Sequence, residues 1–167
     1  ILNERYDSSV INQPFLYVFE PLLNYLSIDY GNHSKDDRLK IIDTALSSKE
    51  GLSYFNFDPN LRNQSFKQTK GNIAVKSNSI DNLIEIHNID KVDIIALDIE
   101  GSELDVLIGA EKTIKKNKPY LSISIYHKPS DLYKIPLLIR TYCKDYKFKI
   151  TFESPTFIGI ILHAIPK

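Results

Sequence analysis

The segment from Val92 to Glu103 constrains the fold more than any other part of the sequence, because an apolar run in it leads directly into acidic residues. The run at 94–97 is typical of a strand that is buried on both faces of a parallel sheet. Asp98 and Glu100 follow it, and Glu103 comes one turn later. In open α/β sheets, ligands bind outside the carboxyl ends of the strands. We therefore expect these carboxylates to lie at a ligand-binding edge.

Asp98 and Glu103 lead to different predictions. Asp98 directly ends a buried strand, where a charge is costly unless it is paired or used, so we predict a functional role for it. Gly101 marks the bend, and Ser102 is placed to cap a helix that continues to Lys116. For Glu103, a place at the edge of the site and a structural role in complementing the helix dipole are both open.

Length and composition describe an ordinary globular domain. The 167 residues are 43% hydrophobic and 25% charged, and predict one domain over 1–167. The 21 basic and 21 acidic side chains cancel, so no nucleic-acid partner is indicated. Apolar runs stay far below the roughly 18 residues of a membrane span. Cys143 is the only cysteine, which excludes an internal disulfide, fits a reducing compartment and predicts a cytoplasmic location.

Strand patterns alternate with helix patterns along the chain. Strands are predicted at 15–19, 39–45, 52–57, 73–76, 92–98, 120–126, 146–152 and 157–164. Helices are predicted at 21–30, after a Ser79 cap, after Ser102, and from Pro136 to about Cys143. The last two strands are close enough for a hairpin. This order predicts a three-layer α/β sheet, mostly parallel, with an antiparallel strand at its edge.

Two further candidates stand where strands end. Glu20 closes the strand at 15–19, and in dinucleotide and nucleoside folds an acid at that place accepts hydrogen bonds from ribose hydroxyls. His127 follows the strand at 120–126. The alternative for Glu20 is an exposed acid that only ends the strand, and the alternative for His127 is a structural histidine. The long polar segment at 58–71 is either mobile or a lid over a substrate.

Five segments resemble one known family, in the same order along the chain. They are Val18–Pro21, Thr44–Ser47 with Gly51, Ser79–Leu83, Leu97–Glu103 with the later Gly109, and Ile123–Pro129 with Asp131 and Leu132. Together they resemble the FkbM-type family of S-adenosylmethionine-dependent methyltransferases. The resemblance implies a Rossmann-like three-layer α/β/α fold and direct displacement of the cofactor's methyl group by a substrate oxygen. Acceptors in the family include hydroxyls of sugars, glycans and secondary metabolites.

The resemblance also implies a site. The predicted contacts to S-adenosylmethionine, on its ribose and adenine sides, are Glu20, Asp43, Ala45 and Leu46. Asp98 and His127 are the candidates for taking the proton of the acceptor hydroxyl. Glu100 and Glu103 are predicted to line the same edge.

One part of the family pattern is missing. The family's first strand and its glycine turn, which wraps the methionine part of the cofactor, have no counterpart in this sequence. None of the six glycines, at 31, 51, 71, 101, 109 and 159, forms a G-x-G pair. We therefore expect the natural polypeptide to extend before Ile1 with a strand that ends in such a turn.

Three alternatives stay open. A nicotinamide oxidoreductase shares the sheet and the acid after its second strand, but the acidic strand end at 98–103 and the closing hairpin favour methyl transfer. A non-catalytic domain that binds a glycan or a protein is favoured by the missing glycine turn. No metal is expected at the site, although the acids offer the oxygen ligands with which Mg²⁺ orients a sugar diol.

Overall fold

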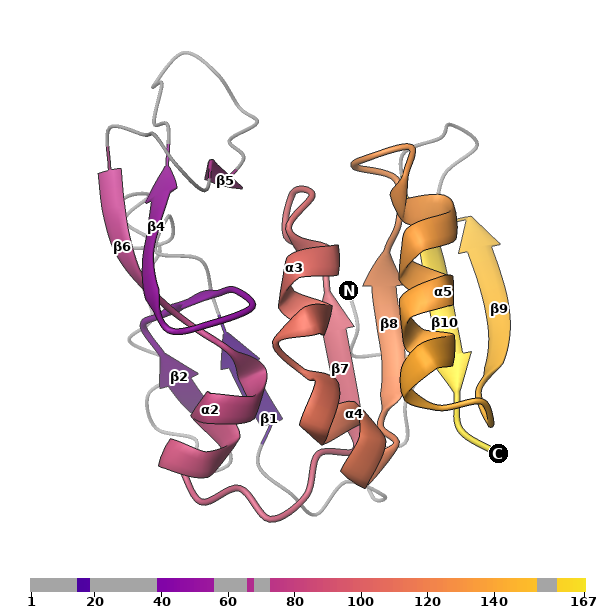
Figure 1. The fold of residues 1–167 in the computed structure, drawn as a ribbon, viewed down its shortest axis with the longest axis horizontal. Helices are drawn as coiled ribbons and strands as arrows, with labels where there is room; N and C mark the ends of the chain where they lie inside the picture. Colours follow the sequence, from indigo (N-terminus) through magenta and orange to yellow (C-terminus); the bar gives the residue numbers. More distant parts are fainter. Residues whose placement is uncertain (1–14, 19–38, 56–65, 68–72, 153–158) are drawn as a thin grey trace. The chain divides into compact units, whose positions relative to one another are not determined.

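The structure is a computed structural model, and it describes residues 15–18, 39–55, 66–67, 73–152 and 159–167 (Figure 1). The chain divides into two compact units between Thr44 and Ala45. A single domain over 1–167 stays a prediction.

The first unit contains a parallel pair of strands. Strand β1 (Phe15–Val18) pairs with β2 (Leu39–Ile42), with Phe15 opposite Leu39. The predicted strand at 39–45 is therefore shorter than expected. It ends at Ile42 because the Thr44 N–H turns back to donate to the Ile42 carbonyl at 2.9 Å. The predicted helix at 21–30 lies outside the described residues.

The first sheet of the second unit runs in the order β7-β8-β10-β9. Its strands are β7 (Ile94–Leu97), β8 (Tyr120–Ser124), β9 (Lys147–Phe152) and β10 (Ile160–Ile165). β7 and β8 are parallel, and β10 is antiparallel to both β8 and β9. The predicted hairpin is confirmed, but its antiparallel strand lies one position inside the edge of the sheet.

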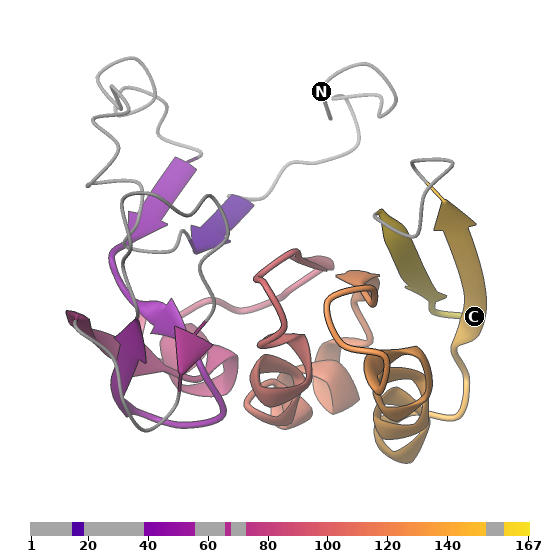
Figure 2. The ribbon, with the colours of Figure 1, turned by 90° about the horizontal axis from the view of Figure 1, so that it is seen from above.

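Three helices pack on one face of this sheet, namely α3 (Glu103–Ile108), α4 (Glu111–Asn117) and α5 (Asp131–Tyr142) (Figure 2). The core lies between them and the strands. Its fully buried members include Val106, Leu107, Ile114, Leu121, Ile123, Ile135, Ile139 and Leu162. In β7 only Ile95 and Leu97 belong to this core, whereas Ile94 and Ala96 are exposed. The prediction that β7 is buried on both faces is wrong, because the described helices cover only one face.

Two helix predictions are also wrong. The helix expected to run from Ser102 to Lys116 is broken at Gly109 and Ala110, where the Ala110 N–H bonds three residues back to the Leu107 carbonyl. Pro136 does not begin its helix but lies inside α5. The helix begins earlier because the Tyr133 and Lys134 N–H groups both donate to the Ser130 carbonyl and close a first turn.

The second sheet of this unit runs in the order β3-β6-β4-β5. Its strands are β3 (Ala45–Leu46), β4 (Gly51–Phe55), β5 (Phe66–Lys67) and β6 (Ile73–Asn78). β3 is parallel to β6, and β4 is antiparallel to both β6 and β5. Both sheets of the second unit are therefore mixed. Apart from β5, the predicted lid at 58–71 lies outside the described residues.

Helix α2 (Ile80–Ile86) follows β6 with the predicted cap. The Ser79 hydroxyl accepts a hydrogen bond from the Asn82 N–H at 3.2 Å. No helix in the part of the chain that the structure describes is both long enough and apolar enough to cross a membrane.

Candidate functional site

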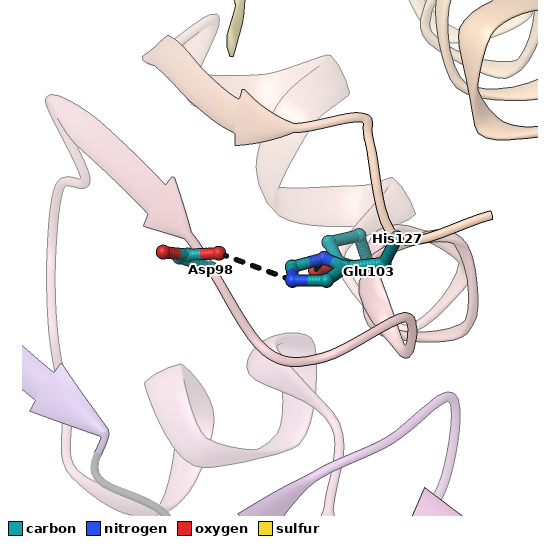
Figure 3. A group of neighbouring side chains, drawn as sticks. All are labelled: Asp98, Glu103 and His127. Carbon is teal, nitrogen blue, oxygen red and sulfur yellow. Dashed lines mark ion pairs between the residues drawn. The ribbon is translucent and has the colours of Figure 1, made fainter. Parts of the chain in front are cut away.

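Parallel pairing of β7 and β8 brings the residues after both strands to one edge of the sheet. Asp98 follows β7, and His127 lies beyond the end of β8. The His127 Nε2 atom is 3.6 Å from Asp98 Oδ1 (Figure 3). The same atom is 3.5 Å from Glu100 Oε2. The structure therefore places these two acids and the histidine close together at this edge.

Glu103 lies on the other side of the His127 ring. Its side chain is fully buried, and its Oε1 atom is 2.8 Å from His127 Nδ1. The same oxygen accepts a hydrogen bond from the Ile99 N–H at 3.0 Å. Glu103 therefore satisfies a backbone group ahead of helix α3 and also contacts the histidine.

The loop between β7 and α3 turns sharply through two left-handed residues, Glu100 at φ 55° and Gly101 at φ 93°. Glycine suits the second position because it adopts a positive φ without steric penalty. The Lys128 ammonium donates to the Gly101 carbonyl and ties this loop to the segment after β8. Ser102 is the N-cap by position, as predicted, but its side chain makes no capping hydrogen bond.

Tyr126 is a member of the site that the sequence analysis did not single out. Its hydroxyl donates to Asp98 Oδ1 at 3.2 Å, and its ring centroid is 4.1 Å from that of His127. Burial, followed by the nearby Asp98 charge, raises the pKa of Tyr126 to about 12. The phenol therefore stays protonated at neutral pH and remains a donor toward the carboxylate. Its place beside His127 at a strand end was the available signal.

Asp131 is the second residue that the analysis did not single out as part of the site. It begins α5, is 1% exposed, and its Oδ2 atom has no hydrogen-bond partner among the described residues. Burial is the main cause that raises the pKa of Asp131, and the charge of Glu103 adds to it. The sequence does not indicate this burial, because Asp131 follows the polar run from His127 to Ser130.

The chain matches a known protein family over most of its length. The family description "Methyltransferase FkbM domain" matches residues 9–150. The chain belongs to the FkbM methyltransferase family. The crystal structure of methyltransferase FkbM from Methylobacillus flagellatus KT at 2.20 Å resolution is similar, with a TM-score of 0.69 and 21% sequence identity. The similarity covers 92% of this chain and 36% of that chain, so this chain spans about a third of that protein. No curated protein matches the chain.

The comparison confirms the predicted family and a methyltransferase fold. The structure brings together Asp98 and His127, which are predicted to act on the acceptor, with Glu100 and Glu103, which are predicted to line the same edge.

The structure describes three of the four residues predicted to contact the cofactor. Glu20 lies outside the described residues. Asp43 is exposed in the first unit, and Leu46 is half-buried in β3 of the second unit. Ala45 fits less well, because its side chain is 1% exposed and has no surface for a ligand.

A metal ion fits this arrangement only in part. Asp98, Glu103 and His127 each offer one ligand atom, and these atoms lie within 4.8 Å of one another. However, Asp98 approaches the Nε2 atom of His127 and Glu103 approaches its Nδ1 atom. The lone pairs of the two ring nitrogens diverge, so an ion on one nitrogen does not meet both carboxylates as they stand.

Proposed function

We propose that this FkbM-family domain is an S-adenosylmethionine-dependent O-methyltransferase whose acceptor is a hydroxyl of a sugar, a glycan or a secondary metabolite. We also propose that its complete fold is the Rossmann-like three-layer α/β/α sheet and that it works in the cytoplasm, where the single cysteine fits a reducing environment. The observation that carries the reaction is the His127 imidazole between carboxylates at the carboxyl ends of two parallel strands.

Methyl transfer to a hydroxyl forms one oxygen–carbon bond, breaks one sulfur–carbon bond and releases the hydroxyl proton. S-adenosylmethionine supplies an electrophilic methyl group on its sulfonium. The protein must hold the acceptor oxygen in line with that methyl group and accept the proton. In this proposal the proton passes to His127 Nε2 by way of the exposed Asp98 carboxylate, because Nε2 itself is buried. The exposed Asp98 carboxylate binds the acceptor and stabilises the imidazolium that forms.

Cofactor contacts are proposed for Glu20, Asp43, Ala45 and Leu46. The two carboxylates are assigned to ribose hydroxyls and the adenine side, and Leu46 to the apolar surface of the base. Ala45 is assigned through its backbone, since its side chain is buried.

Asp98→Asn and His127→Ala are expected to lower kcat for methyl transfer by about 100-fold or more, because a general base typically contributes 10²- to 10⁴-fold. Binding of S-adenosylmethionine should stay within a few fold of the wild type, since both residues act on the acceptor. Single-turnover assays and calorimetry on the purified full-length protein separate the two effects.

Lys116→Ala, an exposed change on α4, is the control for these variants and should leave both readouts unchanged. Wild-type turnover in both site variants would remove Asp98 and His127 from the reaction. Retained glycan binding without any methyl transfer by the wild type would instead favour a non-catalytic domain.

Glu20→Ala is expected to weaken S-adenosylmethionine binding by about 1.5–3 kcal/mol, the range for a hydrogen bond to a charged group. Calorimetric titration of the full-length protein measures it. Unchanged affinity would mean that Glu20 is not in the cofactor pocket, and it would leave the assignment of Asp98 and His127 intact.

A further inference from the structure

We propose that Glu103 is a positioning residue that keeps the proton of neutral His127 on Nδ1 and leaves Nε2 as the unprotonated nitrogen facing Asp98 and Glu100. The tautomer itself follows from contacts within this chain. Its consequence for methyl transfer rests on the proposed function.

The proton of a neutral imidazole goes to the nitrogen that has the better acceptor, and the other nitrogen is left as the base. His127 has acceptors on both sides. Glu103 Oε1 is 2.8 Å from Nδ1, whereas Asp98 and Glu100 oxygens are 3.6 and 3.5 Å from Nε2. An ordinary N–H···O bond measures about 2.7–3.2 Å, so only the Glu103 contact lies within that range.

The carboxylates on the two sides of the ring also differ in their exposure to solvent. The Glu103 side chain is fully buried, and its Oε1 atom is held by the Ile99 N–H. The side chains of Asp98 and Glu100 are 66% and 45% exposed. Water competes for the two exposed carboxylates but not for the buried one. The buried contact therefore decides the position of the proton.

Burial makes this contact necessary for Glu103 as well. A buried carboxylate is costly unless it is paired and hydrogen-bonded, and Glu103 Oε2 has no hydrogen-bond partner among the described residues. The Nδ1 contact does not yet have hydrogen-bond alignment. The ring must rotate about χ2 to align Nδ1–H with the carboxylate, and catalytic hydrogen bonds often align only when substrate binds. A buried carboxylate behind a histidine has the same orienting role in hydrolase triads.

The direct test is nitrogen NMR of the full-length protein labelled with ¹⁵N-histidine, at a pH about two units above the ordinary histidine pKa of about 6.5. The chain has four histidines, and His127→Ala identifies the signal of interest. We expect wild-type His127 to carry its proton on Nδ1. A proton on Nε2, or an imidazolium at this pH, would overturn the proposal without any variant.

Glu103→Gln is expected to reduce the Nδ1 preference. The amide oxygen in the place of Oε1 still faces both the Ile99 N–H and Nδ1, but it is neutral and therefore a weaker acceptor than a carboxylate, whereas Asp98 and Glu100 keep their charge beside Nε2. Glu103→Asp keeps the charge and should retain the wild-type tautomer in part. Glu111→Gln makes the same chemical change on exposed α4 and should leave the His127 signals unaltered. An unchanged tautomer in a folded Glu103→Gln protein would contradict the assignment.

Kinetics separate this inference from the proposed function. If the protein methylates its acceptor, Glu103→Gln should lower kcat by roughly 100-fold, in the range of a lost general base, with little change in cofactor affinity. If no acceptor is methylated, the proposed function fails, and the NMR result still accepts or rejects the role of Glu103 in fixing the tautomer.

Discussion

The Gly109→Ala variant is expected to lose about 3 kcal/mol or more of unfolding free energy, at the upper end of the cost of overpacking a well-packed site. A Cβ atom at Gly109 would overlap the Ser47 carbonyl oxygen. It would also lie 2.9 Å from Ser79 Cβ and 3.0 Å from Ser48 Cα. Two of these three atoms belong to backbone, so no side-chain rotation relieves the overlap.

Hydrogen bonds hold the surrounding backbone in place. The Gly109 carbonyl accepts from the Asp81 N–H at 2.9 Å, and the Ser47 N–H donates to the Asn78 carbonyl at 2.9 Å. The φ of Gly109 is −76°, which any residue adopts. Alanine would otherwise be favoured by about 0.5–1 kcal/mol at a helical position. Steric overlap therefore outweighs the helix preference of alanine, and the substitution is expected to lower the stability.

Gly51→Ala is the matched control. The nearest atom to a Cβ at Gly51 is Ser77 Oγ at 4.0 Å, which is an ordinary contact. Thermal unfolding should show Gly51→Ala close to the wild type and Gly109→Ala about 6–12 °C lower, since 1 kcal/mol corresponds to about 2–4 °C in a domain of this size. Equal melting temperatures for the two variants would show that the Gly109 junction yields easily.

The sequence predicts elements well where the signal is local. The strands β1, β4, β8 and β9 coincide with apolar or alternating runs. The Ser79 cap involves only residues 79–82. Prediction from sequence fails where contacts between residues far apart in the chain determine the local structure. The break at Gly109 results from the approach of residues 47–48, and the open face of β7 results from helices that cover only one side.

The same division holds for the candidate site. Asp98 and His127 could be placed together because both follow strands, and parallel strands end at one edge. The contact of Glu103 with Nδ1 and the burial of Asp131 could not be predicted. Both depend on how helices α3 and α5 pack, which side-chain spacing in the sequence does not specify.

Asp81→Ala is expected to cost about 2–4 kcal/mol of unfolding free energy, since it removes a cap worth about 0.5–2 kcal/mol and also leaves a buried hydroxyl without its acceptor. Asp81 lies in the first turn of α2, where its sequence position indicates only an interaction with that helix's dipole. The structure shows that its carboxylate accepts from the Lys112 N–H at 2.9 Å, and from the Thr113 N–H and hydroxyl at 2.8 and 2.6 Å.

These bonds cap a different helix. Ala110, the N-cap residue of α4, has no side-chain oxygen, so Asp81 supplies the acceptor for α4 from α2. Asp81→Asn keeps one acceptor oxygen and should cost less than Asp81→Ala. Asp93→Ala, which breaks only the exposed pair with Lys91, should change stability by less than about 1 kcal/mol. If chemical denaturation ranks Asp81→Ala with Asp93→Ala, then water replaces the carboxylate at the start of α4 and this contact does not join the two helices.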